Sequence, residues 1–381
     1  MGTQTQNGNP AQEAGRPQPQ TTNEGPGGPF IRHSQPGRNP VYTRAGDPFS
    51  TVITQALVSK PGYYRNFRVN HTFVTTGTIT GTVALTADAP YNVNALIQLK
   101  DAFGTPLIVA PGYEVANLIG IFGGHFGLNN QTNVPSGLPS WAALSTTTGA
   151  GGFSYALPLE FAKGYGVLSG ANASLLPTLQ FNMNNGATVF GPSSTGVYPT
   201  ITTTVDTDFY WLPEGVAVEP PGLGTTRQWL LQQANPTIAA NSASRVQFPR
   251  LGGYLDTIVL EVRDSTGARS DGFWPSRLQI YIDGVPLIDS TMPEIYDDMA
   301  IQFGGVTRPT GVVAFSRKTS LNQQSLGLLD TGETYLSTNP GTLIEANFSP
   351  AGNGSNSPAQ LSVLVGQIVP TGAIIQGLPE L

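Results

Sequence analysis

The sequence predicts an all-β protein built from two tandem β-sandwich domains with a few short helices. The chain has 381 residues, more than one compact core usually organises. It contains 46 Gly and 32 Pro, which helix interiors exclude and tight turns between short strands use. From about Val52 onward, apolar residues alternate in short runs such as Phe67, Val69 and Phe73, bounded by Gly, Asn or Asp.

The charge content of the chain is low. Only 11% of residues are charged, which indicates a surface covered in large part by protein partners, since soluble monomers usually keep a well-charged exterior. The net charge of −6 and the absence of a basic patch argue against a nucleic-acid-binding surface. The chain lacks Cys, so packing rather than disulfides or Cys-ligated zinc must hold the fold together. We expect no signal peptide and no membrane span, because no apolar stretch approaches roughly 20 residues.

Residues 1–48 read as a flexible N-terminal arm, rich in Gln, Asn, Gly and Pro and nearly free of aliphatic residues. Its charges almost cancel, unlike those of arms that neutralise packaged genomes. The charged residues of the arm are Arg16, Arg32, Arg38, Arg44, Glu13, Glu24 and Asp47. We therefore expect the arm to contact neighbouring protein subunits.

The two predicted domains comprise residues 49–219 and 220–381. The first closes with an apolar strand over residues 204–213, which Pro213 stops, and a linker with Pro220, Pro221 and Gly222 follows. Residues 225–233 begin with Thr and continue with good helix formers, which predicts a short helix at the start of the second domain. A capping hydroxyl and an early Pro predict another short helix over residues 290–299.

An internal repeat supports the two-domain interpretation. Residues 94–108 and residues 276–288 each contain a strand, an Asp/Gly turn and a Pro-Leu-Ile return strand. Further along, Ile121-Phe122-Gly123-Gly124 matches Ile301-Gln302-Phe303-Gly304-Gly305. We interpret the two halves as two copies of one sandwich domain; the alternative is chance similarity among strand and turn residues.

The residues that flank these segments match in the same order. Gly62-Tyr63 corresponds to Gly253-Tyr254, and residues 176–179 correspond to residues 340–343. The separation between matching residues falls from 191 for the first pair to 157 for Pro213 and Pro370. Loop insertions in the first half would produce this steady decrease.

The order of these segments resembles that of the double jelly-roll major capsid proteins of tailless icosahedral viruses of the tectivirus type, the PRD1-adenovirus lineage. The residues that carry the resemblance are 62–74, 94–124 and 209–213 in the first half, and 253–262 and 278–305 in the second. The resemblance covers residues 50–381, lies in the layout rather than in one motif, and implies two jelly rolls.

The resemblance also implies a function. In that family, three chains form a pseudo-hexagonal capsomer that tiles an icosahedral shell, so a homotrimeric structural protein of the virion, assembled in the host cytoplasm, is expected. The implied partners are other copies of the chain, neighbouring capsomers, and other capsid and vertex proteins. Such capsomers often overlie an internal membrane. No catalysis, cofactor or sequence-specific nucleic acid is expected.

The sequence offers few candidate residues for a catalytic or metal site. The three histidines, His33, His71 and His125, are far apart in the sequence and predict structural or surface roles rather than a metal site. The sequence contains neither a Gly-x-Ser-x-Gly elbow nor a Walker-type phosphate loop. We therefore predict no catalytic, cofactor-binding or metal-binding residues.

Adjacent carboxylates and glycines have a structural interpretation. Asp297 and Asp298, together with Asp283 before Gly284, suggest a calcium loop or a glycosidase pair, but turn and helix-dipole roles explain them better. The Gly-Gly pairs beginning at residues 123 and 304 are typical of tight turns after helices rather than of anion-binding loops.

Two aromatic clusters could stack on a sugar ring. They are Phe209-Tyr210-Trp211 and Phe273-Trp274. Strand alternation favours packing instead, with Trp211 in the core of the first domain and Tyr210 pointing elsewhere.

Three alternatives to a double jelly-roll capsid protein stay open at this point. A spike, fibre or carbohydrate-binding adhesin would also be β-rich, but the chain has no shaft repeat. A secreted polysaccharide-active enzyme would need a convergent acidic or His constellation. The α/β shell fold of tailed phages would need long helices and more charge.

Overall fold

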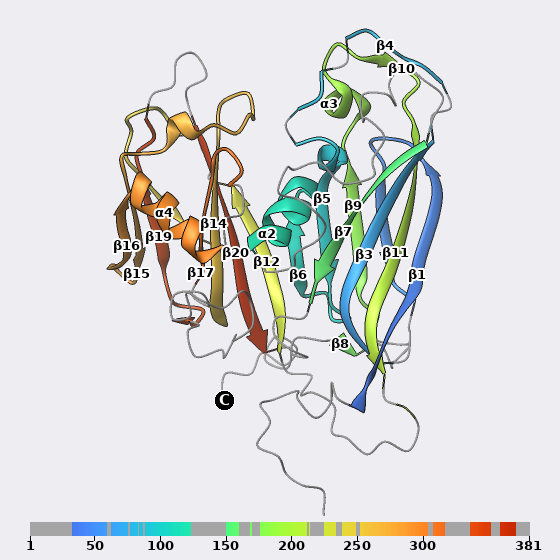
Figure 1. Ribbon diagram of the computed structural model, residues 1–381, viewed down its shortest axis with the longest axis horizontal. Helices are drawn as coiled ribbons and strands as arrows, with labels where there is room; N and C mark the ends of the chain where they lie inside the picture. The colour runs from blue at the N-terminus through green and yellow to red at the C-terminus, as the bar shows by residue number, and fades with distance from the viewer. Residues whose placement is uncertain are drawn as a thin grey trace, which may run out of the picture.

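Two β-sandwiches stand side by side (Figure 1), the first drawn in blue to green and the second in yellow to red. The computed structural model describes residues 33–58, 62–74, 77–82, 84–86, 88–122, 150–159, 168–169, 176–211, 213, 225–233, 238–248, 252–303, 308–316, 336–351 and 359–370. Among these residues no helix is long and apolar enough to cross a lipid bilayer.

The first sandwich has eight main strands in two facing sheets of four. One sheet has the order β1 (Gln35–Asp47), β11 (Thr200–Trp211), β3 (Tyr63–Val74), β7 (Ala150–Pro158). The other runs β2 (Val52–Ala56), β9 (Thr178–Met183), β5 (Asn94–Lys100), β6 (Pro106–Ala110). The shorter elements are β4 (Ile79–Thr80), η1 (Tyr91–Val93), η2 (Glu114–Ile119), α2 (Gly120–Phe122), β8 (Leu168–Ser169), α3 (Gly186–Phe190) and β10 (Thr195–Gly196).

The second sandwich is likewise built from two four-stranded sheets. Its first sheet has the order β12 (Thr225–Gln233), β20 (Gln360–Pro370), β14 (Tyr254–Arg263), β17 (Val312–Ser316). Its second sheet runs β13 (Ser244–Gln247), β19 (Ile344–Phe348), β15 (Arg277–Ile282), β16 (Val285–Thr291). The remaining elements are η5 (Asp271–Phe273), α4 (Met292–Gln302) and β18 (Leu336–Ser337).

The two sandwiches are copies of one topology. In each, the first, eighth, third and sixth main strands form one sheet, and the second, seventh, fourth and fifth form the other. A helix follows the fifth strand in both: η2 and α2 in the first copy, α4 in the second. Two four-stranded sheets connected in this way form a jelly roll. The repeat predicted from the sequence is therefore confirmed, and the chain is a double jelly roll.

The predicted matching hairpins are also present. The β5–β6 turn is held by Asp101, whose Oδ1 accepts hydrogen bonds from the amides of Phe103 (2.9 Å) and Thr105 (2.8 Å). The β15–β16 turn has Asp283 and Gly284 at positive φ (48° and 80°), which is the conformation of a type I′ hairpin turn. The two turns thus use Asp differently at equivalent places.

Gly62 and Gly253 mark the same position in the two rolls. Each precedes the third main strand, and a Cβ atom at either would overlap a backbone carbonyl oxygen: that of Tyr210 on β11 and that of Ile368 on β20, respectively. Only a residue without a side chain lets the backbones approach this closely. The repeated Gly-Tyr pair in the sequence therefore reflects one steric constraint met twice.

The helix predicted over residues 290–299 is α4. Thr291 and Glu294 form a capping box, in which the Glu294 carboxylate accepts a hydrogen bond from the Thr291 amide (2.8 Å), and Pro293 lies in the first turn. The helix buries Met292, Ile295 and Met299 on one face.

The helix predicted over residues 225–233 is wrong. These residues form β12, which pairs antiparallel with β20 along its whole length and parallel with β6 at Trp229 and Leu230. A position between two strands overrides the helix propensity of Arg, Gln and Leu, because burial on both faces and two ladders of hydrogen bonds outweigh a preference worth a few tenths of a kcal/mol per residue.

The predicted N-terminal arm extends too far. Residues 35–47 form β1, an edge strand paired with β11, and Arg38 binds the Asp208 carboxylate of β11 at 2.6 Å. The scarcity of aliphatic residues in this stretch favours an arm. An edge strand that buries little more than Val41 does not need them.

Other boundary predictions stay predictions. The remainder of the arm lies almost entirely in residues 1–32, outside the described residues. The boundary between residues 219 and 220 and the linker at Pro220, Pro221 and Gly222 also lie outside them, between β11 and β12.

The two rolls share a sheet. Because β12 pairs with β6 in parallel, the second sheet of the first roll and the first sheet of the second roll join into nine strands, β18 included. The parallel pairing gives both rolls the same orientation. Buried apolar side chains of both rolls form one continuous cluster.

Candidate functional site

The best-defined polar site lies at the interface between the two rolls, which we call the inter-roll interface. In the first roll it is formed by Asp88 before η1, by Tyr113 and Glu114 at the start of η2, and by Phe122. In the second it is formed by Glu261 and Arg263 of β14, by Arg269 and by Phe303.

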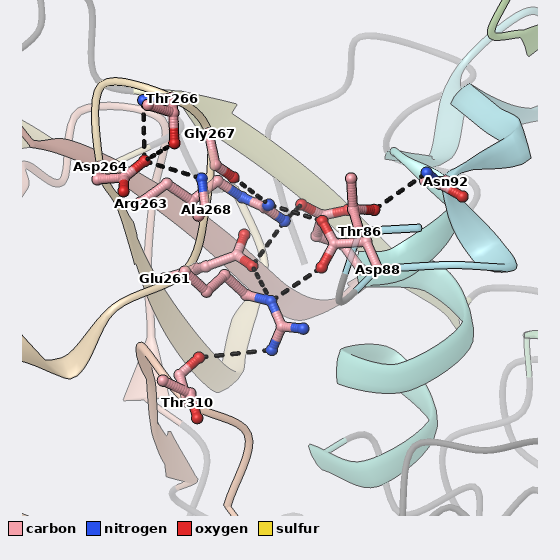
Figure 2. Close-up of polar contacts among 12 residues, drawn as sticks. Thr86, Asp88, Asn92, Glu261, Arg263, Asp264, Thr266, Gly267, Ala268 and Thr310 are labelled. Carbon is pink, nitrogen blue, oxygen red and sulfur yellow. Dashed lines mark hydrogen bonds and ion pairs between the residues drawn. The ribbon is translucent and has the colours of Figure 1, made fainter. Parts of the chain in front are cut away.

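Asp88 bridges two arginines of the second roll (Figure 2). Its Oδ2 accepts a hydrogen bond from Arg263 at 2.7 Å, and its Oδ1 accepts one from Arg269 at 2.9 Å. The side chains of all three are at most 15% exposed. Ion pairs this far from water are screened little by salt, so they fix the position of one roll against the other.

A local turn presents the two arginines. The Asp264 carboxylate accepts hydrogen bonds from the amides of Thr266 (2.8 Å) and Ala268 (2.9 Å), and Gly267 adopts a φ of 85°. The turn brings Arg263 and Arg269 into an isolated β-bridge, and the guanidinium groups of both bind Asp88 of the first roll.

Two glutamates converge on Arg263 from opposite rolls. One guanidinium nitrogen of Arg263 lies 2.8 Å from Glu261 Oε1 and 3.3 Å from Glu114 Oε1. The side chains of Glu114 and Glu261, which we call the acidic pair, are 3% and 2% exposed. The second oxygen of each carboxyl is buried and accepts no hydrogen bond from the described residues.

These contacts shift the pKa values of Glu261 and Arg263. Burial raises the pKa of Glu261 well above its ordinary value, and the neighbouring Glu114 carboxyl raises it further. Burial alone would lower the pKa of Arg263, but the surrounding Glu261, Asp88 and Glu114 raise it, so Arg263 stays charged.

Aromatic contacts accompany the ion pairs. The guanidinium of Arg269 lies 4.0 Å from the centre of the Tyr113 ring, a cation–π contact between the rolls. The rings of Phe122 and Phe303, which end the matching helical segments of the repeat, meet edge to face at 4.9 Å. The inter-roll interface is therefore both charged and apolar.

His71 forms a separate polar cluster in the core of the first roll. Its Nε2 accepts a hydrogen bond from the Asn94 amide (3.1 Å) and lies 3.2 Å from the Tyr155 hydroxyl, and its Nδ1 lies 3.0 Å from Thr203 Oγ1. In the neutral tautomer Nδ1–H donates to Thr203, and both ring nitrogens are satisfied. The structural role predicted for His71 is what the structure shows.

Burial lowers the pKa of His71 to about 3. In the unfolded chain the pKa of His71 is about 6.5, so below that pH the unfolded chain binds a proton that the folded chain does not bind. The free energy of unfolding therefore decreases as the pH falls. As the pH falls from 7 to 5, wild type should therefore lose about 2 kcal/mol in free energy of unfolding that the His71→Gln variant does not lose. Chemical denaturation at both pH values measures it. His33→Gln, at an exposed position, is the matched control for the substitution.

The other sequence candidates do not converge on a site. Asp283 accepts a hydrogen bond from the Leu343 amide (2.8 Å) and shapes the β15–β16 turn, while Asp297 and Asp298 are exposed on α4. His125 and the Gly-Gly pairs beginning at residues 123 and 304 lie outside the described residues. In the part of the chain that the structure describes, no three His, Cys, Asp or Glu side chains are grouped to hold a metal ion.

Most residues of the two aromatic clusters are buried and pack against other side chains. Phe209, Tyr210, Phe273 and Trp274 are each at most 7% exposed, which leaves no face of their rings for a sugar. The prediction for Trp211 was wrong: it is 39% exposed and Tyr210 is buried. Trp211 is the last residue of β11, and a register shift after Asp208 breaks the alternation on which that prediction depended.

The sequence does not predict the inter-roll interface. The hydrogen-bonded partners on opposite rolls are 149 to 181 residues apart, so no local motif joins them. One feature could have indicated it: Glu261 and Arg263 interrupt the run Tyr254–Arg263, whose other members from Leu255 on are buried. Two charges spaced by two residues in a buried strand lie on one face and need partners.

The comparisons with known proteins agree with the fold. No protein-family model and no curated protein sequence matches the chain. Among solved structures, the atomic structure of Sulfolobus Turreted Icosahedral Virus is similar over 91% of this chain and 94% of that chain, with a TM-score of 0.61 and 14% identity. The PBCV-1 virus capsid is similar over 88% and 93%, with a TM-score of 0.60 and 10% identity. The Faustovirus major capsid protein is similar over 88% and 90%, with a TM-score of 0.57 and 9% identity. The chain therefore shares the double jelly-roll fold with these viral capsid proteins over nearly its whole length.

Proposed function

We propose that the chain is the major capsid protein of an icosahedral virus and acts as a homotrimer with a pseudo-hexagonal outline. The observation that carries this proposal is the duplication: one chain presents two jelly rolls of the same topology, side by side and in the same orientation. The similarity to solved viral capsid structures over about nine-tenths of the chain supports it.

The geometry explains how such a chain would tile a shell. Three chains related by a closed threefold axis bring together six similar rolls, and six similar rolls give a six-sided outline. Each roll must then hold a fixed angle to its neighbour within the chain. The shared sheet and the buried ion pairs of the inter-roll interface supply that rigidity.

Surface chemistry is consistent with extensive protein contacts. Only 11% of residues are charged, and the equivalent hairpins β5–β6 and β15–β16 each expose a large apolar residue, Phe103 (54%) and Val285 (67%). The proposed partners are other copies of the chain, neighbouring capsomers, and other capsid and vertex proteins, with an internal membrane beneath the shell. The proposed location is the virion after assembly in the host cytoplasm, and the proposed role is structural rather than enzymatic.

A comparison of the full chain with a deletion of residues 1–32 tests the proposal. A deletion extending to residue 45 would remove most of β1, so the truncation must stop before Gln35. We expect both proteins to form trimers, measured by light scattering, and we expect closed shells in electron micrographs only from the full chain, in which the remainder of the arm contacts neighbouring capsomers. A monomer in both cases would contradict the trimeric capsomer, and normal shell yield from the truncated chain would remove the role of the arm.

A further inference from the structure

Among the described residues, the inter-roll interface holds more acidic than basic groups. Asp88, Glu114 and Glu261 face two cations, Arg263 and Arg269, within a region where these side chains are at most 15% exposed. If every group were ionised, the cluster would carry one uncompensated negative charge away from water. Such a charge is costly, and a buried acid usually avoids it by keeping its proton.

The geometry indicates where that proton lies. Glu114 and Glu261 both approach the same nitrogen of Arg263, and their two carboxyl groups are also in hydrogen-bond contact with each other. Each also has a buried second oxygen without a hydrogen-bond donor among the described residues. One proton on one of these oxygens gives the other its missing donor and makes the cluster neutral.

We propose that Glu114 and Glu261 share one proton across the inter-roll interface, and that this proton locks the two rolls together until alkaline conditions remove it. Loss of the proton would leave two adjacent carboxylates on opposite rolls, with Asp88 nearby, and their repulsion acts directly to separate the rolls. The lock belongs to the single chain and does not depend on the chain forming a shell.

The direction of the pH dependence follows from linkage. The pKa of Glu261 is raised in the folded chain, so between the unfolded and the folded value the folded state holds a proton that the unfolded state has lost. The stabilisation is complete below the unfolded value of about 4.5 and is lost as pH rises through the folded value. Tyr113, a further titratable group beside the pair, has a pKa that burial raises further from neutrality, so it stays neutral in the same range.

The test compares wild type, Glu114→Gln and Glu261→Gln as full-length proteins between pH 7.5 and pH 9.5. In wild type we expect the unfolding constant to rise about tenfold per pH unit while the folded chain holds the proton. In both variants this slope should be absent. In wild type, the protection of the η2 and β14 amides against hydrogen exchange should fall at alkaline pH before that of the amides around His71. Asp289→Asn is the matched control, because Asp289 pairs with Arg277 on the surface of the second roll; it should keep the wild-type slope.

Infrared spectroscopy gives a readout that does not depend on the stability of the variants. At pH 7.5 wild type should show the carbonyl stretch of one protonated carboxyl group per chain, and both glutamine variants should lose it. Absence of this band in wild type, or equal alkaline slopes in all proteins, would overturn the proposal. So would a stoichiometric metal ion found by elemental analysis together with a missing band, because a cation would then neutralise the cluster.

Discussion

Replacing Trp229 with alanine should lower the free energy of unfolding by about 3–5 kcal/mol and reduce the yield of soluble protein. Trp229 is fully buried on β12, where it pairs with Ile108 of the first roll and with Gly366 of β20. Its ring lies directly over Gly366, where a Cβ atom would come within 2.6 Å of it. The substitution removes a large side chain at the junction between the rolls, and the surrounding strands cannot collapse into the space. Chemical denaturation of the purified protein measures the loss.

Trp211→Ala is the matched control for that experiment. Trp211 is 39% exposed at the end of β11, so its removal should cost about 1 kcal/mol or less. Equal losses for the two tryptophans would contradict the placement of Trp229 at the centre of the junction.

Replacing Arg263 with alanine should cost about 3–5 kcal/mol, because it leaves Asp88 and the acidic pair buried without their shared cation. Lysine should restore little of the loss, since one ammonium group cannot reproduce the guanidinium's simultaneous contacts with Asp88, Glu114 and Glu261. Thermal melting followed by circular dichroism measures both variants. Arg277→Ala, which removes an exposed ion pair on the same roll, should melt as wild type does. A wild-type melting temperature for Arg263→Ala would show that the ion pairs contribute nothing to joining the rolls.

The duplicated fold could be predicted from the sequence because its signals are local and occur twice. The Gly-Tyr pairs at residues 62 and 253 meet the same steric constraint, and the two Asp-containing hairpins each lie within about fifteen residues of sequence. The cap of α4 is equally local, since Thr291, Pro293 and Glu294 are consecutive or nearly so. In each case the residues that determine the structure are neighbours in the chain.

The two wrong element assignments have the opposite cause. Residues 225–233 form a strand only because β6 and β20 flank them, and nothing within those residues encodes that environment. Residues 35–47 form a strand because β11 offers an edge and Asp208 binds Arg38. Partners 121 to 176 residues away decide both structures, so composition alone could not reveal them.

The inter-roll interface could be predicted least of all. Asp88, Glu114 and Arg263 come from three elements, and each charge by itself is typical of a surface residue. The duplication predicts two rolls, but it does not predict that charged groups are buried between them. Only the spacing of Glu261 and Arg263 in a buried strand points to such an interface.

The most direct test of the proposed capsid role is an electron cryo-microscopy reconstruction of the purified full-length oligomer. We expect three chains around one axis and six lobes in the outline, with each chain supplying two adjacent lobes that are joined through β6 and β12. A monomer, an elongated rod, or an oligomer whose outline does not show two equivalent lobes per chain would contradict the account and favour a spike or adhesin instead.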